Sequence, residues 1–200
     1  MLILVSGATK TVRSITHKNL GVLITPQDGN LLPHDKMWAA DNAAYSNWDE
    51  KKFLNMLWKI EKHHNKPIFV ACPDVVGNAK ETAKRFNYYQ PLLKELNLPV
   101  ALVLQNGQEA IGVPWNLLDA IFIGGDDTFK LYNPYIHYIV DKAKSLNKWV
   151  HFGRVNSYKR MKYVKKIGAD SIDGTGFSMF PDLKIPSALR FLEKEQYSLF

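Results

Sequence analysis

The sequence predicts an α/β fold, a compact and imperfect TIM-like β/α barrel in which helices surround a ring of parallel strands. Three observations predict it: the length of 200 residues, the presence of eight short apolar runs, and the alternation of these runs with helical patterns from the third run onward. An open doubly wound sheet is the alternative. The barrel would be small, because this fold typically has roughly 250 residues. The segments that connect the first strand to the second and the second to the third are too short for full helices.

The expected strands are short and apolar, as is typical of strands buried on both faces. They are Leu2–Val5, Gly21–Ile24, Met37–Ala40, Ile68–Ala71, Val100–Leu104, Ala120–Ile123, Trp149–Phe152 and Ala169–Ile172. The length predicts one domain that spans residues 1–200. The sequence contains no internal repeat, low-complexity tract or domain linker.

The expected helices have apolar residues at three- and four-residue spacing. They are Asp49–His63, Ala79–Leu96, a helix opened by Asn133-Pro134, residues 158–166, and a last helix from about Pro186 to Glu195. In the fourth, Asn156 or Ser157 is the expected cap. That helix is expected to bury Tyr158, Met161 and Val164.

Composition and charge favour a basic, globular protein. The chain has 26 Lys and Arg against 19 Asp and Glu, a net charge of +7, which favours a polyanionic partner such as nucleic acid. A lysine-rich segment such as 158–166 also fits a merely solvated face. The single cysteine, Cys72, lies in an apolar run and suits a buried, inert thiol. No apolar run approaches the roughly 18 residues of a membrane span. We expect a cytoplasmic protein with no membrane partner and no cofactor.

Polar residues and glycines follow six consecutive expected strands. They are Asp41 and Asn42; Asp74; Gln105 and Asn106; Gly124, Gly125, Asp126 and Asp127; Arg154 and Asn156; and Asp173. In βα folds the carboxyl ends of the strands meet at one mouth, so we expect these residues to line one site. Helix capping and ordinary turns explain residues such as Asp74 and Asp127. They do not require Gln105, Arg154 or the paired glycines.

Two carboxylates with different partners suit chemistry at an anomeric carbon, where one attacks and the other transfers protons. We expect Asp173 to be the nucleophile and Asp41 the general acid/base. Tyr45 offers an aromatic face to a planar base, although it fits a core aromatic equally well. The residues expected to bind the base are Tyr45, Asp74, Gln105, Gly124 and Gly125.

A divalent metal ion is the second hypothesis for this mouth, because Asp41, Asp74 and Asp173 offer the oxygen ligands that hard cations prefer. The histidines do not favour it. His63 and His64 are adjacent at a helix end and are expected to face different directions, and the other four share no ligand spacing. The sequence has no GxxxxGK(S/T) phosphate loop. We therefore expect no metal site.

Residues from about Trp38 to Phe177 resemble the tRNA-guanine transglycosylase superfamily, and more closely its short phage-associated branch related to DNA deazaguanine transglycosylases. The matching stretches, in colinear order, are ADNAAY, CPD with ETAKRFNYY, LVLQNG, FIGG and HFGRVNSYKRMKYVKKIGADSIDGT. The resemblance implies Asp173 as the nucleophile, Asp41 as the acid/base carboxylate and Tyr45 as the stacking residue. The base-binding positions that it implies are Asp74, Gln105, Gly124 and Gly125.

The chain also departs from that family. The family's zinc-binding cysteines and histidine are absent, and the C-terminal insertions that support tRNA binding are missing. These departures argue against a tRNA substrate and against deazaguanine specificity, and they leave the two carboxylates in place. Arg154 and Asn156 belong to the GRVN pattern of the short branch. We expect both of them, with Lys159 and Arg160, to contact the nucleic-acid backbone.

The sequence therefore predicts an enzyme that cleaves the base–sugar N-glycosidic bond of a target or modified nucleotide in DNA, single-stranded or with the base flipped out. RNA is the alternative substrate. A free base as co-substrate would make the enzyme a transglycosylase, and water would make it a DNA glycosylase that leaves an abasic site. The competing hypotheses are a catalytically silent nucleic-acid-binding domain and a metal-dependent hydrolase. The enzyme hypothesis predicts that Asp41 and Asp173 share one cavity and that the pKa of at least one is raised.

Overall fold

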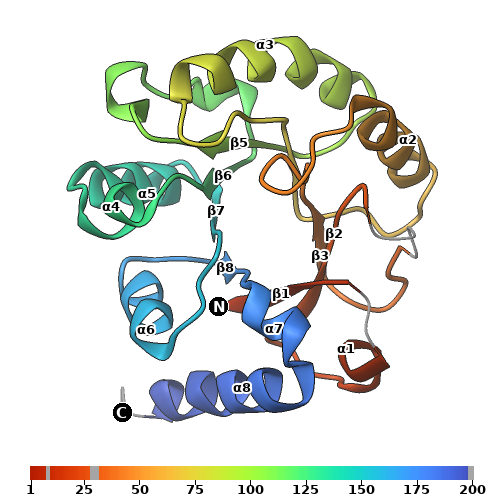
Figure 1. The fold of residues 1–200 in the computed structure, drawn as a ribbon, viewed down its shortest axis with the longest axis vertical. Coiled ribbons are helices and arrows are strands. Elements are labelled where there is room, and N and C mark those ends of the chain that lie inside the picture. The colour runs from red at the N-terminus through yellow and green to blue at the C-terminus, as the bar shows by residue number, and fades with distance from the viewer. Residues whose placement is uncertain (8–9, 28–31, 198–200) are drawn as a thin grey trace.

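The computed structural model describes residues 1–7, 10–27 and 32–197, and within them eight parallel strands form a closed barrel surrounded by helices (Figure 1). Each strand pairs in parallel with the next, and β8 pairs with β1 to close the ring. The strands are β1 (Leu2–Ser6), β2 (Leu20–Ile24), β3 (Trp38–Ala40), β4 (Val70–Ala71), β5 (Val100–Leu104), β6 (Ala120–Ile123), β7 (Trp149–Phe152) and β8 (Ser171–Ile172). The predicted barrel is confirmed, and the alternative of an open sheet is excluded.

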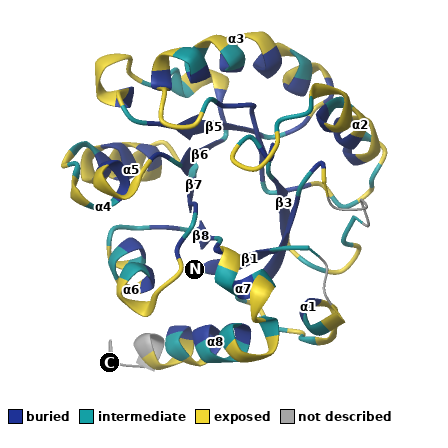
Figure 2. Cartoon of the chain, viewed as in Figure 1, coloured by how far each residue is buried: buried dark blue, intermediate teal, exposed yellow. Residues whose placement is uncertain are grey.

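Side chains alternate between two packed layers along the strands, which are buried almost throughout (Figure 2). One layer packs against the helices. The other fills the barrel and consists of Leu2, Leu4, Leu23, Ala39, Phe69, Ala71, Ala101, Val103, Ala120 and Phe122. Its alanines leave room for the rings of Phe69 and Phe122, whose centroids lie 6.2 Å apart. The barrel interior is therefore a packed core.

The helices lie around the outside of the ring (Figure 1). They are α1 (Lys10–Ser14), α2 (Glu50–Glu61), α3 (Ala79–Glu95), α4 (Asp127–Tyr132), α5 (Tyr135–Ser145), α6 (Tyr158–Lys166), α7 (Thr175–Met179) and α8 (Pro181–Tyr197), with 3-10 turns at Gln108–Ala110 and Trp115–Leu117. Four of them are capped at the N-terminus by a side chain that accepts a hydrogen bond from the backbone N–H of the residue three positions later. The caps are Asp49, Asn78, Asp126 and Ser157.

Two details of the predicted helices are wrong. Tyr158 is 44% exposed, whereas Met161 and Val164 are buried as expected. The reason is that Tyr158 opens the first turn of α6 and lies against Phe191 of α8, with ring centroids 5.5 Å apart. The last helix begins at Pro181 rather than near Pro186, because a proline at the first helical position is favourable.

The thiol of Cys72 is buried, and burial raises its pKa, as expected for an inert residue. Across the described residues, no helix combines the length and the apolar character that a membrane crossing would require.

Candidate active site

A cavity of about 330 Å³ lies at the carboxyl ends of the strands. All of the predicted catalytic and base-binding residues line it: Asp41, Tyr45, Asp74, Gln105, Gly124, Gly125 and Asp173. Of the four predicted backbone contacts, Arg154 also lines the cavity. The structure thus brings together residues that are far apart in the sequence.

Two nitrogen atoms contact the carboxylate of Asp173, which comes directly after β8. The backbone N–H of Arg154 donates to Oδ1 at 2.9 Å, and Nε2 of His151 lies 3.0 Å from Oδ2. Arg154 has a left-handed backbone (φ 60°), which is uncommon outside glycine, at the point where its N–H reaches Asp173. The side chain of Asp173 remains 14% exposed. Its orientation is therefore fixed while it still faces the cavity.

His151 is a site residue that the sequence reasoning missed. It is fully buried on β7, and its Nδ1 lies 2.8 Å from the hydroxyl of Ser171, which accepts a hydrogen bond from Trp149 Nε1 at 2.8 Å. A carboxylate only accepts hydrogen bonds, so the position of Asp173 favours the tautomer of a neutral His151 with its proton on Nε2, and the Ser171 hydroxyl can then donate to Nδ1. The alternation of residues 149, 151 and 153 along the strand is the signal that places His151 inside the barrel.

Asp41, which follows β3, has the most perturbed carboxyl group of the mouth. Burial first, and then the charges of Asp173 and Asp74, raise its pKa from 3.8 to about 7. The backbone N–H of Asn42 donates to Oδ1 at 2.8 Å and opposes this rise. A carboxyl group with this pKa exchanges protons readily near neutral pH, which suits a general acid/base. The expectation of a raised carboxylate pKa is confirmed for Asp41.

Asp74 is held in a buried network with two amide side chains. Gln105 Nε2 donates to its Oδ2 at 2.6 Å, and Asn42 Nδ2 donates to its Oδ1 at 2.9 Å. Burial raises the pKa of Asp74, while these two hydrogen bonds oppose the rise. Oε1 of Gln105 accepts from the backbone N–H groups of Gly77 (2.8 Å) and Gly125 (2.9 Å). Gln105 thus ties the Asp74 loop to the paired-glycine loop.

The paired glycines after β6 are required by close packing. A Cβ atom on Gly124 would lie 2.8 Å from Gln105 Nε2. On Gly125, which has φ +70°, it would lie 2.6 Å from the ring of Phe129 and 2.9 Å from the Asn106 side chain. The backbone N–H of Gly125 is used by Gln105, so this loop shapes the cavity wall through its lack of side chains.

Tyr45 and Arg154 meet across the mouth of the cavity. Tyr45 is 68% exposed and is therefore not a core aromatic, although the sequence fitted that role equally well. The guanidinium carbon of Arg154 lies 4.4 Å from the centroid of the Tyr45 ring, and one guanidinium N–H donates to the carbonyl of Gly125. The guanidinium group of Arg154 thus covers one face of the Tyr45 ring.

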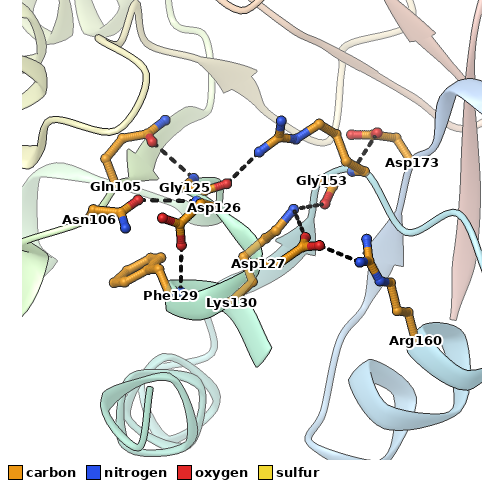
Figure 3. Close-up of polar contacts among 11 residues, drawn as sticks. Gln105, Asn106, Gly125, Asp126, Asp127, Phe129, Lys130, Gly153, Arg160 and Asp173 are labelled. Carbon is orange, nitrogen blue, oxygen red and sulfur yellow. Dashed lines mark hydrogen bonds and ion pairs between the residues drawn. The ribbon is translucent and has the colours of Figure 1, made fainter. Parts of the chain in front are cut away.

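A charged cluster lies beside Asp173, on the loops that follow β6 and β7 (Figure 3). Lys130 is only 3% exposed, and its Nζ donates to the carbonyl of Gly153 at 3.1 Å. Burial, followed by the charge of Arg154, lowers the pKa of Lys130 to about 8. Asp127 lies 4.0 Å from Lys130 and also pairs with Arg160. The sequence did not indicate Lys130, because α4 was not expected.

The remaining predicted backbone contacts lie on the same end of the barrel. Lys159 and Arg160 lie in the first turn of α6, which follows the loop after β7, and Lys159 is exposed. Oδ1 of Asn156 accepts a hydrogen bond from the backbone N–H of Gly176 at 3.2 Å. Asn156 therefore joins the loop after β7 to the first turn of α7.

The expectation that the histidines do not cluster is wrong. His34, His63 and His64 each place a ring nitrogen within 4.8 Å of the others. His34 precedes β3, and the other two lie between α2 and β4, so the group sits at the amino ends of the strands. Spacing in the sequence did not reveal it, because His34 reaches the group from a separate loop.

No family model and no curated protein matches this sequence. Among solved structures, the chain is similar to one described as "PaMucR Phosphodiesterase, c-di-GMP complex", with a TM-score of 0.41 and 12% identity. The match covers 80% of this chain and 61% of that one, less than two thirds of its length. A likeness of this degree says nothing about activity, and the barrel assignment rests on the strand pairing itself.

Proposed function

We propose that this protein cleaves the base–sugar N-glycosidic bond of a nucleotide in DNA, with Asp173 as the nucleophile and Asp41 as the general acid/base. One observation carries the proposal: two carboxyl groups line one cavity in different surroundings, and one of them has a pKa of about 7. Displacement of a base from C1′ needs a carboxylate that attacks and an acid that protonates the leaving group. The resemblance of the surrounding motifs to base-exchanging enzymes supports this choice of reaction.

In the first step, an oxygen of Asp173 attacks C1′ of the sugar. A C1′–O bond forms while the C1′–N bond to the base breaks, and the electron pair of the broken bond goes to the base nitrogen. Asp41 gives its proton to the departing base and becomes ionised. The hydrogen bonds from His151 and the Arg154 backbone hold Asp173 in place during the attack.

In the second step, a water molecule or a free base attacks C1′ of the ester formed with Asp173. Asp41 takes the proton of the incoming nucleophile, and the electron pair of the breaking C1′–O bond returns to the Asp173 carboxylate. Water yields an abasic site, and a free base yields an exchanged nucleotide. Both carboxyl groups return to their starting protonation states.

Recognition of the base would involve Asp74 and Tyr45. The buried carboxylate of Asp74 is an acceptor for N–H groups on the edge of a base, and the Tyr45 ring is a stacking surface. Because the cavity lies inside the mouth of the barrel, a base paired in a duplex must be flipped out to enter it. The cations Arg154, Lys159 and Arg160 would contact phosphates beside the flipped nucleotide.

The decisive experiment incubates the protein with modified and unmodified DNA, single-stranded and duplex, and assays abasic sites and released bases. RNA substrates and added free bases test the other variants of the reaction. We expect Asp173→Asn to abolish product, and a denaturing gel should show a covalent enzyme–DNA species that this variant lacks. The matched control is Asp141→Asn, which removes an exposed carboxylate on α5. The absence of product from every nucleic acid would refute the proposal.

The same assay separates the competing hypotheses. A silent binding domain predicts that Asp173→Asn changes nothing, whereas Lys159→Ala should weaken DNA binding and reduce its dependence on salt. A metal-dependent hydrolase predicts loss of activity with EDTA. Among the described residues, the oxygens of Asp41, Asp74 and Asp173 are not gathered within 4.8 Å of one another, so we expect activity to survive EDTA.

A further inference from the structure

The histidine cluster at the amino ends of the strands lies apart from the cavity and needs its own explanation. The ring centroids of His34, His63 and His64 are 4.6 to 5.1 Å apart. His34 and His64 are exposed and His63 is half-buried. Three imidazoles thus face one another from two loops that are separated along the chain by α2.

His63 has one ring nitrogen held by the backbone and one left unused. Its Nδ1 lies 2.9 Å from the carbonyl oxygen of Asn65 and 3.2 Å from the backbone nitrogen of the same residue. Its Nε2 is the one buried side-chain nitrogen or oxygen, among the described residues, that has no hydrogen-bond partner. According to the tautomer, Nδ1 accepts from the Asn65 backbone N–H or donates to the Asn65 carbonyl. In the tautomer that donates Nδ1–H to the carbonyl, Nε2 keeps a lone pair, which is how metal-binding histidines are held.

Asn65 also fixes the loop that carries His34. Its side-chain Nδ2 donates to the carbonyls of Pro33 and Lys36, both at 3.2 Å. Its carbonyl oxygen accepts from Trp38 Nε1 at 3.1 Å. The two loops are therefore fastened to each other and to β3, so the position of the cluster is built into the fold.

We propose that His34, His63 and His64 bind one divalent transition-metal ion, with zinc as the fitting member of the class. Three imidazole nitrogens and a water molecule make a tetrahedral set that zinc accepts. At Zn–N distances of roughly 2.0–2.1 Å, the nitrogens of such a site lie roughly 3.4 Å apart, so the rings must close from their present spacing. The exposed His34 and His64 can make this movement by side-chain rotation while His63 stays in place.

The metal would clamp the β2–β3 loop to the turn between α2 and β4. Because this end of the barrel is opposite to Asp41 and Asp173, the ion would stabilise the fold without entering the chemistry of the cavity. Binding to the folded state alone raises the melting temperature in proportion to the logarithm of the metal concentration. This inference is independent of the proposed function.

The test uses the full chain, stripped with chelator and dialysed. We expect calorimetry with Zn²⁺ to give one site per chain, Co²⁺ to give the visible absorption of a tetrahedral complex, and thermal unfolding to shift upward with either ion. His34→Ala and His64→Ala change exposed residues and should each weaken zinc binding at least tenfold. His137→Ala, an exposed histidine on α5, is the control and should bind as the wild type does.

Three results would overturn the proposal. One is the absence of saturable binding in the wild type. Another is binding that survives both His34→Ala and His64→Ala, which would place the ion elsewhere. The third is equal weakening by His137→Ala, which would indicate adventitious binding by surface histidines. Glycosidic activity, if present, should be the same with and without zinc.

Discussion

Replacing Asp41 with asparagine should stabilise the protein, and the effect should grow with pH. Burial and the neighbouring charges of Asp173 and Asp74 raise the pKa of Asp41 from 3.8 to about 7 in the folded state. Between these two values the unfolded chain has released the proton and the folded protein still holds it. The folded state therefore loses stability as pH rises through this window, and the loss is complete above about pH 7.

The size of the effect follows from the raised pKa. A difference of about 3 pKa units corresponds to about 4 kcal/mol at full ionisation. This is an upper limit, because Asp41 keeps some contact with solvent in the cavity. Asparagine has nearly the same shape and cannot ionise. Relative to the wild type, the free energy of unfolding of Asp41→Asn should therefore rise by up to roughly 2.5 kcal/mol between pH 5 and pH 8.

Urea denaturation of both proteins at a series of pH values from 5 to 8 measures this difference. Subtracting the two curves removes the contributions of groups that titrate in both proteins, such as Lys130. Asp141→Asn serves as the control, and its difference from the wild type should not depend on pH. The excess in the free energy of unfolding of Asp41→Asn over the wild type should grow with pH. An excess that stays constant or shrinks would refute the raised pKa of Asp41 as its cause. The same variant should lose glycosidic activity.

Two further predictions test the scaffold of the cavity. His151→Leu should lower kcat about 100-fold with little change in KM, because Asp173 loses a donor that orients it, and His151→Gln should recover part of the rate. Steady-state kinetics checks this, and a rise in KM alone would contradict it. Gly125→Ala should cost about 1–3 kcal/mol more, by chemical denaturation, than Gly7→Ala. Both glycines have positive φ, but the added Cβ meets neighbours at Gly125 and none within 4 Å at Gly7, so equal losses would count against steric packing.

The strands could be predicted from the sequence because buried parallel strands are continuous apolar runs between polar residues. The runs at Val100–Leu104 and Ala120–Ile123 match β5 and β6 residue for residue. The run at Ala169–Ile172 shortens to Ser171–Ile172 in the structure, because Ala169 and Asp170 belong to the irregular segment between the turn after α6 and β8. Asp173 still emerges at the end of the strand, since the polar residue itself marks the end.

The predicted cavity residues could be found from the sequence because each follows a strand. The residues and hydrogen bonds that hold them in place could not be found in this way. His151 lies inside a strand, and Lys130 is reached through a short helix whose pattern is too brief to detect. The bond between Gln105 and the Gly125 backbone depends on loop conformation, which a linear pattern does not contain. The histidine cluster likewise depends on the Asn65 side chain, which brings two loops together.

The order of the strands around the barrel gives a physical reason for the separate roles of the two carboxyl groups. Asp173 directly follows β8 and Asp41 directly follows β3, and the ring order β8, β1, β2, β3 places two strands between them. Displacement at C1′ needs the nucleophile on the face of the sugar opposite the departing base, with the proton donor on the side of the base. Carboxyl groups from adjacent strands would approach the sugar from nearly one direction. Groups on separated strands, converging on one cavity, can approach it from two.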